Sequence, residues 1–172
     1  MTRARAEGPP RPPLRAFLGP LRNATIILLW THLFWSKCYA VGSTKGPSML
    51  PTIGVSGEWV LISKFHTRGR EIRVGDLVSF QHPYDGRDVG VLKRVIGMPG
   101  DFVLKDPTDF TGDMLQVPRG HMWVTGDNLP HSVDSRRYGP IPLAMVNGKI
   151  LAKAERLWKW QWLRNPLFEG EP

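Results

Sequence analysis

Cysteine is nearly absent from this sequence, because Cys38 is the only one among 172 residues. The chain therefore has no internal disulfide and no cysteine-rich metal site. Its five histidines also lack the paired spacing of metal ligands, so we expect no metal and no other cofactor. A chain of this length has room for one modest core, which excludes a second enzymatic domain.

Acidic residues are outnumbered by 23 lysines and arginines, and the net charge of +8 is concentrated at the two ends of the chain. Residues 1–23 hold five arginines against one glutamate, and residues 149–164 hold five basic residues against one glutamate. Basic ends beside apolar segments are typical of proteins at an anionic membrane surface, not of proteins in a nucleic-acid groove. We therefore expect membrane lipid, and no nucleic acid, as a partner.

The sequence also lacks a long uncharged apolar run. Residues 1–23 are rich in proline and arginine and are predicted to be a flexible arm. Residues 24–42 contain one cation, but only 14 residues separate Arg22 from Lys37, whereas a membrane span needs about 20. We predict an N-terminal membrane helix over 24–42. An interfacial helix and an arginine-rich transit sequence are the alternatives.

The 18 glycines and 16 prolines predict short strands after this helix. Apolar runs bounded by turn residues predict strands at 59–62, 77–80, 89–92, 102–104, 121–124 and 149–153. We therefore expect a mainly β, irregular antiparallel domain over 43–155, with a surface loop or small insertion at 106–118.

The C-terminal segment, 156–172, is rich in tryptophan. Trp158, Trp160 and Trp162 alternate with a period of two. Each indole has an apolar body and an N–H that needs a partner. This segment either packs on the core as an edge strand or contacts a membrane interface.

Two segments carry a candidate nucleophile and a candidate base. Residues 46–52, Gly-Pro-Ser-Met-Leu-Pro-Thr, predict an exposed loop that holds Ser48 between two prolines. Residues 91–101 predict an apolar strand in which Lys93 shares a face with Val91 and Val95. Burial would lower the pKa of this lysine and leave a neutral amine that accepts a proton from serine. An exposed edge lysine that prevents aggregation is the alternative.

A third segment, 126–140, is dense in polar residues and reads Gly-Asp-Asn-Leu-Pro-His-Ser-Val-Asp-Ser-Arg-Arg-Tyr-Gly-Pro. Such segments are often only hydrogen-bonded turns. Here an Asp134–Arg136 ion pair and the hydroxyl of Ser132 are also suited to brace a neighbouring catalytic pair.

In this order, the three segments resemble the type I signal peptidase family, and the resemblance covers roughly residues 42–150. It implies a signal-peptidase-like antiparallel β domain in which Ser48 is the acyl-forming nucleophile and Lys93 its general base. It also implies that Ser132 orients the lysine amine, while Asp134 and Arg136 form a supporting salt bridge.

Gly46 departs from this family pattern. Many bacterial members carry a hydroxyl residue at this position, two residues before the nucleophile, and that hydroxyl donates to the oxyanion. The oxyanion hole of this chain is then expected to use the Ser48 backbone N–H, with a second donor not identified.

Residues 138–142, Tyr-Gly-Pro-Ile-Pro, and residues 148–150, Gly-Lys-Ile, look most like family members of the mitochondrial inner membrane. The resemblance implies that location, with the catalytic domain facing the intermembrane space. It also implies substrates that are precursor polypeptides with cleavable sorting peptides, and a heterodimer with a homologous second protease subunit.

Several other functions are weighed against this hypothesis. A Ser-His-Asp hydrolase would use His131 and Asp134, but both lie on one tight loop and no Gly-x-Ser-x-Gly motif is present. Self-cleaving repressors also use serine and lysine, but they need a DNA-binding domain. A bacterial-type signal peptidase and a non-enzymatic, membrane-anchored β adaptor remain alternatives. The adaptor predicts that Ser48 and Lys93 can be replaced without loss of function.

Overall fold

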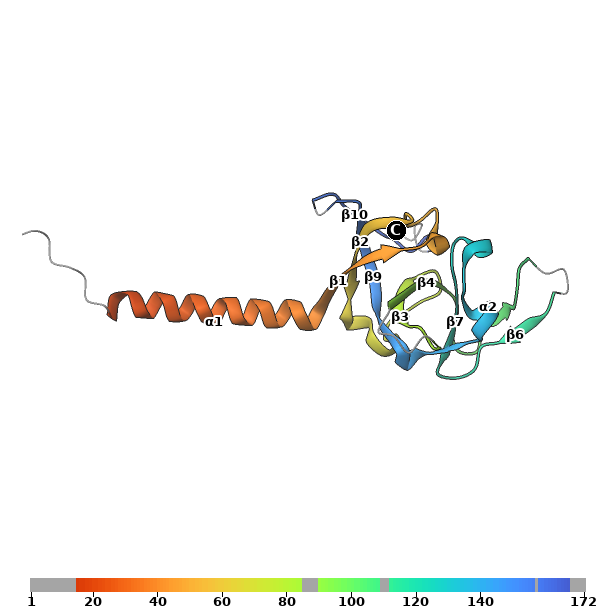
Figure 1. The fold of residues 1–172 in the computed structure, drawn as a ribbon. Coiled ribbons are helices and arrows are strands. Elements are labelled where there is room, and N and C mark those ends of the chain that lie inside the picture. Colours follow the sequence, from red (N-terminus) through yellow and green to blue (C-terminus); the bar gives the residue numbers. More distant parts are fainter. Residues whose placement is uncertain (1–14, 85–89, 109–111, 157, 168–172) are drawn as a thin grey trace, which may run out of the picture. The chain divides into compact units, whose positions relative to one another are not determined.

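The computed structural model describes residues 15–84, 90–108, 112–156 and 158–167 (Figure 1). The chain divides into two compact units, Met1–Lys37 and Cys38–Pro172. The predicted arm over 1–23 lies mostly outside the described residues.

The first unit contains most of helix α1, Arg15–Cys38. The predicted helix over 24–42 is wrong at its C-terminal end, because residues 39–42 belong to strand β1, Tyr39–Lys45, and pair with strand β2, Ser56–Ser63. Among the described residues, no helix has both the length and the apolarity required for a membrane span. This finding corrects the prediction of a membrane-spanning helix. Polar residues such as Asn23, Thr31 and His32 interrupt the apolar run.

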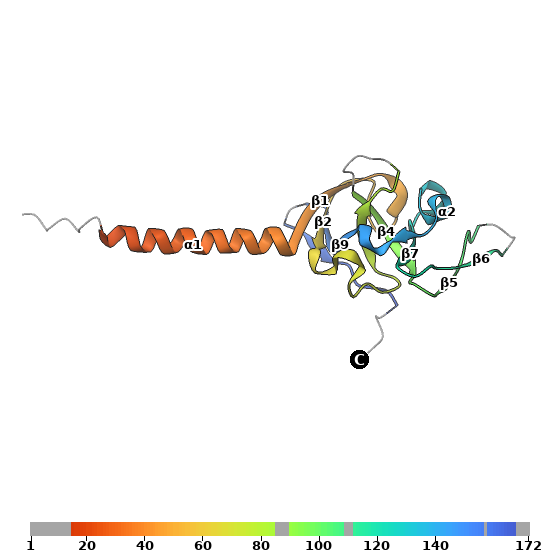
Figure 2. The same ribbon diagram turned by 90° about the horizontal axis from the view of Figure 1, so that it is seen from below.

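The second unit is built on an antiparallel sheet, so the prediction of a mainly β domain is confirmed (Figures 1 and 2). The strand order is β1-β2-β9-β3-β4-β7-β8, and β10 pairs with β9. The further strands are β3 Leu77–Gln81, β4 Gly90–Gly97, β7 His121–Thr125, β8 Ile141–Pro142, β9 Val146–Ala154 and β10 Trp160–Trp162. The connections contain the short helices η1 Pro47–Met49, η2 Lys64–Gly69, η3 Leu129–His131, α2 Ser135–Tyr138 and η4 Leu143–Met145.

Two segments are more regular than the sequence predicted. The predicted loop at 106–118 contains strand β6, Met114–Gln116, which pairs with β5, Phe102–Leu104, in a separate two-stranded sheet. In the C-terminal segment, β10 adds to the main sheet by pairing with β9, as the edge-strand alternative predicted. Its tryptophans are nevertheless not buried, since Trp158 is 77% and Trp162 is 66% exposed.

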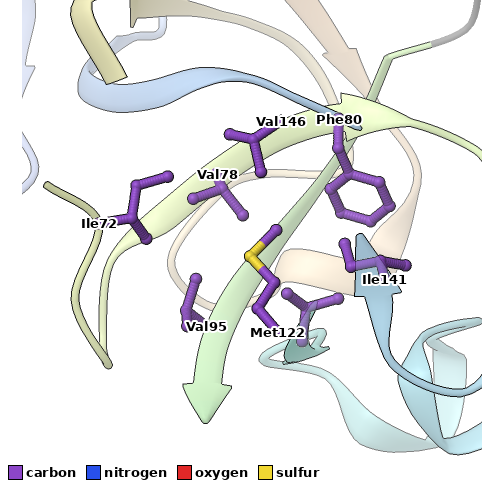
Figure 3. Packing of buried hydrophobic residues seen from close by; sticks show 8 residues of the cluster. Ile72, Val78, Phe80, Val95, Met122, Ile141 and Val146 are labelled. Atoms are coloured by element: carbon purple, nitrogen blue, oxygen red, sulfur yellow. The ribbon is translucent and has the colours of Figure 1, made fainter. Parts of the chain in front are cut away.

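Two main clusters of buried side chains form the core. The larger one joins β3, β4, β7, β8 and β9 and comprises Ile72, Val78, Phe80, Val95, Met122, Val124, Ile141 and Val146 (Figure 3). The second comprises Met49, Ile53, Val60, Leu77 and Ile150. Because Met49 and Ile53 flank the loop after Ser48, this second cluster fixes that loop to the sheet.

Replacing Phe80 with alanine should destabilise the domain strongly. Its ring is fully buried beside Ile141 in the larger cluster (Figure 3), and removal of such a ring costs about 3–5 kcal/mol. The free energy of unfolding, measured with denaturant in detergent solution, checks this. Phe102→Ala is the matched control, because Phe102 is 65% exposed. Equal losses for both variants would contradict the assigned core.

Candidate active site

Ser48 lies on η1, and the residue that precedes this helix, Gly46, has a backbone conformation that favours glycine. Gly46 precedes the helix with φ 104° and ψ 155°, a backbone conformation that side-chain-bearing residues rarely adopt. Its N–H donates to Val55 O at 2.6 Å, which closes the loop. Met49, 5% exposed, holds the helix against the core. The backbone conformation at position 46 therefore favours glycine.

Lys93 reaches Ser48 from β4. Its side chain lies on the inner face of the strand, and the residue is only 4% exposed. Alternation predicted that one of the two adjacent cations faces the core, and the structure shows that it is Lys93. The Nζ atom donates to Ser48 Oγ at 2.8 Å. Two residues 45 positions apart in sequence are thus in direct hydrogen-bond contact.

The environment of Lys93 favours the neutral amine. Burial lowers its pKa from 10.5 to about 8, although the negative charges of Asp134 and Asp127 oppose that shift. A shift of this size corresponds to roughly 3 kcal/mol between the two protonation states. A lysine with this pKa is neutral in a substantial fraction of molecules at mildly alkaline pH and can then accept a proton.

Arg94, the next residue on β4, binds a different segment. Its guanidinium donates to both carboxylate oxygens of Asp127, at 2.8 and 2.7 Å, and to Gly75 O at 2.8 Å. Thr52 Oγ1 also donates to Asp127. This network joins the strand of Lys93, the loop after Ser48 and the segment before Ser132.

Backbone contacts bring that last segment directly onto Ser48. Asn128 N donates to Ser48 O at 3.0 Å, and its side-chain amide donates to Pro47 O at 3.0 Å. Gly126 is required for this approach, because a Cβ there would lie 2.4 Å from Ser48 O and 2.3 Å from Ser132 Oγ. Only glycine at position 126 therefore leaves room for Ser48 and Ser132 at these distances.

Ser132 is 4% exposed and lies close to Gly126. Its Oγ makes no hydrogen bond of acceptable geometry to any described residue. The hydroxyl nevertheless lies near enough to Asp134 to help lower the pKa of that carboxyl group.

Asp134 and Arg136 form the predicted ion pair. Arg136 Nε donates to Asp134 Oδ1 at 2.9 Å, and Arg136 also donates to Leu129 O at 2.6 Å. Burial of the fully enclosed Asp134 opposes ionisation, but hydrogen bonds from Arg136 and the Gly126 amide, together with the nearby Ser132 hydroxyl, outweigh it and lower the carboxyl pKa. The pair therefore holds the 129–136 loop in one conformation.

A cleft of about 360 Å³ contains Ser48 and Lys93 in its lining. Residues 42–46, from β1 and the following turn, and residues 90–93 of β4 also line it. Strand β1 is an edge strand of the sheet. Such an edge can hydrogen-bond an extended peptide.

The structure brings all six sequence-predicted site residues into one region. The roles of Arg94, Asp127, Asn128 and Gly126 were missed, although each lies inside a segment that the sequence analysis singled out. No pattern in the sequence indicated that Arg94 and Asp127 would pair. In the part of the chain that the structure describes, no group of three or more His, Cys, Asp or Glu residues is arranged to hold a metal ion.

Comparison with known proteins gives consistent matches. The family model described as signal peptidase, peptidase S26, matches residues 20–106 and 102–155. The chain is 41% identical over 143 residues to mitochondrial inner membrane protease subunit 1 of Schizosaccharomyces pombe, covering 82% of this chain and 88% of the relative. It is 42% identical to subunit 1 of Homo sapiens, covering 77% and 80%.

A relative with a different name also matches. Mitochondrial inner membrane protease subunit 2 of Saccharomyces cerevisiae is 34% identical over 141 residues, covering 76% of this chain and 78% of the relative. The family model and these relatives each cover most of the chain, and the residues matched by the family model include 46–52, 91–101 and 126–140. The chain therefore belongs to the signal peptidase family, peptidase S26.

Proposed function

We propose that this chain is a serine endopeptidase that removes sorting peptides from precursors at the mitochondrial inner membrane. Membership of the signal peptidase family and the names of the relatives support a membrane protease that processes mitochondrial precursors. The observation that carries the proposed Ser-Lys mechanism is the 2.8 Å contact between Lys93 Nζ and Ser48 Oγ.

In the proposed reaction, neutral Lys93 takes the Ser48 proton as Oγ attacks the scissile carbonyl carbon. The ammonium then gives that proton to the departing amine, which leaves an ester between the substrate acyl group and Ser48. Water attacks this ester with Lys93 again acting as base, and Ser48 Oγ recovers its proton. The Ser48 backbone N–H is the proposed oxyanion donor, because Gly46 offers no side chain.

The remaining predicted residues have positioning roles in this proposal. Ser132 Oγ, which is buried in the same region, is the proposed group that orients the Lys93 amine. Asp134 and Arg136 hold the loop that carries it. The acyl side of the substrate would add as an extended strand at the β1 edge of the cleft, with side chains pointing into it.

Ser48→Ala and Lys93→Met should each abolish processing of an inner-membrane precursor. Each change removes one member of the dyad, and losses of at least about a thousandfold are typical of such changes. Mass spectrometry of the precursor N-terminus, in cells with matched amounts of each variant, measures the effect.

Ser56→Ala and Lys105→Met are matched controls, because Ser56 is exposed and Lys105 is half-exposed beside Asp113, outside the cleft. Both controls should trim the precursor at the wild-type bond. Normal trimming by either dyad variant would refute the mechanism and favour the non-enzymatic adaptor.

The pH dependence follows from the lowered pKa of Lys93. Protonated lysine cannot act as the base, so activity requires the form present above a pKa of about 8. We expect kcat/KM to rise roughly tenfold per pH unit from about pH 6 to 7.5 and to level off above about 8. A rise centred near the ordinary pKa of lysine, or a flat profile, would contradict the buried base.

We also propose that a tryptophan face contacts membrane lipid. Cross-strand pairing places Trp59 and Trp160 on either side of Ala154, and Leu61 and Trp162 on either side of Ala152. Both alanines are 1% exposed, whereas the three tryptophans remain 36–66% exposed. Basic residues at 153, 156, 159 and 164 are close to these tryptophans in the sequence. Indoles with neighbouring cations suit an anionic lipid interface.

A double change, Trp160→Ala with Trp162→Ala, should weaken binding of the full chain to vesicles roughly tenfold, because it removes two interfacial rings. Cosedimentation with phosphatidylcholine vesicles, with and without an anionic phospholipid, measures this. Phe102→Ala with Met114→Ala is the control, since both residues are exposed on the separate two-stranded sheet. Equal weakening by the two pairs would refute a specific lipid face.

We infer that the catalytic domain faces the intermembrane space and that a homologous second subunit is the partner. Support comes from relatives named subunit 1 and subunit 2, both of which are similar to this chain. Separate migration of the two chains in a mild detergent extract would contradict the pairing.

A further inference from the structure

A second hollow lies beyond Ser48, apart from the cleft described above. Its volume is about 580 Å³, and it is lined by Leu50, Pro51 and residues 127–130. Neither the cleft nor the dyad mechanism assigns it a role.

The position of this hollow follows from helix η1. The cleft contains Ser48 and Lys93 in its lining, whereas the hollow is lined by Leu50 and Pro51, directly after η1, and by residues 127–130. Asn128, in the hollow wall, donates to both Pro47 O and Ser48 O. The hollow therefore adjoins the C-terminal end of η1, and the nucleophile lies in the neighbouring cleft.

We propose that this hollow binds the first residues on the carboxyl side of the scissile bond, and this rests on the proposed function. A substrate bound at Ser48 must extend in both directions. Its acyl side has the cleft, which contains Ser48 and Lys93. The hollow binds the part of the substrate that leaves with the new N-terminus.

The lining indicates which side chains it accepts. The Asp127 carboxylate already binds Arg94 through both oxygens and also accepts from Thr52. The Asn128 amide is engaged with Pro47 O. The groups left to meet a substrate are Leu50 and Leu129, both half-buried, with the two prolines. The hollow thus selects an apolar side chain after the cleaved bond.

A site that holds the amine leaving group can also hold an amine that is added to the reaction. When an amine attacks the acyl ester, a new amide bond forms and the bond to Ser48 Oγ breaks. The proton lost by the amine passes through Lys93 to Oγ. The ratio of this aminolysis to hydrolysis therefore reports binding in the hollow, independently of the steps that form the ester.

The test uses the full chain in detergent with a peptide ester that has a small alcohol leaving group. Leucinamide or glycinamide is added, and products are quantified by mass spectrometry. The wild type should prefer leucinamide as acceptor, and Leu129→Ala should reduce that preference roughly three- to tenfold, as expected for loss of an apolar contact. Leu104→Ala, on β5 outside both depressions, is the matched control and should keep the wild-type ratio.

A variant that gains a new acceptor preference tests the assignment further, because misfolding cannot explain such a gain. Leu129→Lys should shift the preference toward aspartic acid amide, because it places a cation in the hollow. No leucinamide preference in the wild type, or unchanged ratios in both Leu129 variants, would overturn the assignment. Ester hydrolysis by Ser48→Ala tests the proposed function separately, since activity there would remove the dyad and with it the basis of this inference.

Discussion

The bidentate salt bridge between Arg94 and Asp127 is the interaction on which the geometry of the site depends. Both side chains are less than one fifth exposed, at 17% and 13%. Paired charges of this kind are strong and directional when their hydrogen bonds are satisfied, and loss of one partner leaves a buried charge, which costs about 3–5 kcal/mol. Because Asp127 is adjacent to Gly126 and Asn128, this one contact sets how closely the Ser132 loop approaches Ser48.

The support for Arg94 extends to the C-terminal part of the chain. Gly75 O accepts from Arg94, and the turn around Gly75 is held by Asn165, whose amide donates to Val74 O and to Asp76 Oδ1. Gly75 has φ +90°, and a Cβ there would lie 2.3 Å from Asn165 Oδ1. The segment after β10 is therefore a structural part of the catalytic domain, and it contributes to the position of β4.

Sequence reasoning identified the parts of this site that depend on local pattern. Strand periodicity placed Lys93 on the same face as Val91 and Val95, and three ordered motifs indicated Ser48, Ser132, Asp134 and Arg136. It failed where the decisive contact is long-range. Arg94 and Asp127 are 33 residues apart, and no period relates them. The helix end at Cys38 was also missed, because it is set by the pairing of residues 39–42 with β2, which the local sequence does not show.

Lys93 and Arg94 show how one strand supplies two cations with opposite tasks. Alternation sends Lys93 into a nearly dry environment, where desolvation favours the neutral amine, and sends Arg94 to a carboxylate that satisfies its charge. The same carboxylate, with Asp134, opposes the loss of the lysine proton. Without these two acids, burial would lower the pKa of Lys93 further. The amine would then stay neutral but would be a weaker base toward serine. The pKa of about 8 is the balance of the two effects, and it leaves a base that is strong enough to deprotonate Ser48 and still neutral in part of the molecules near neutral pH.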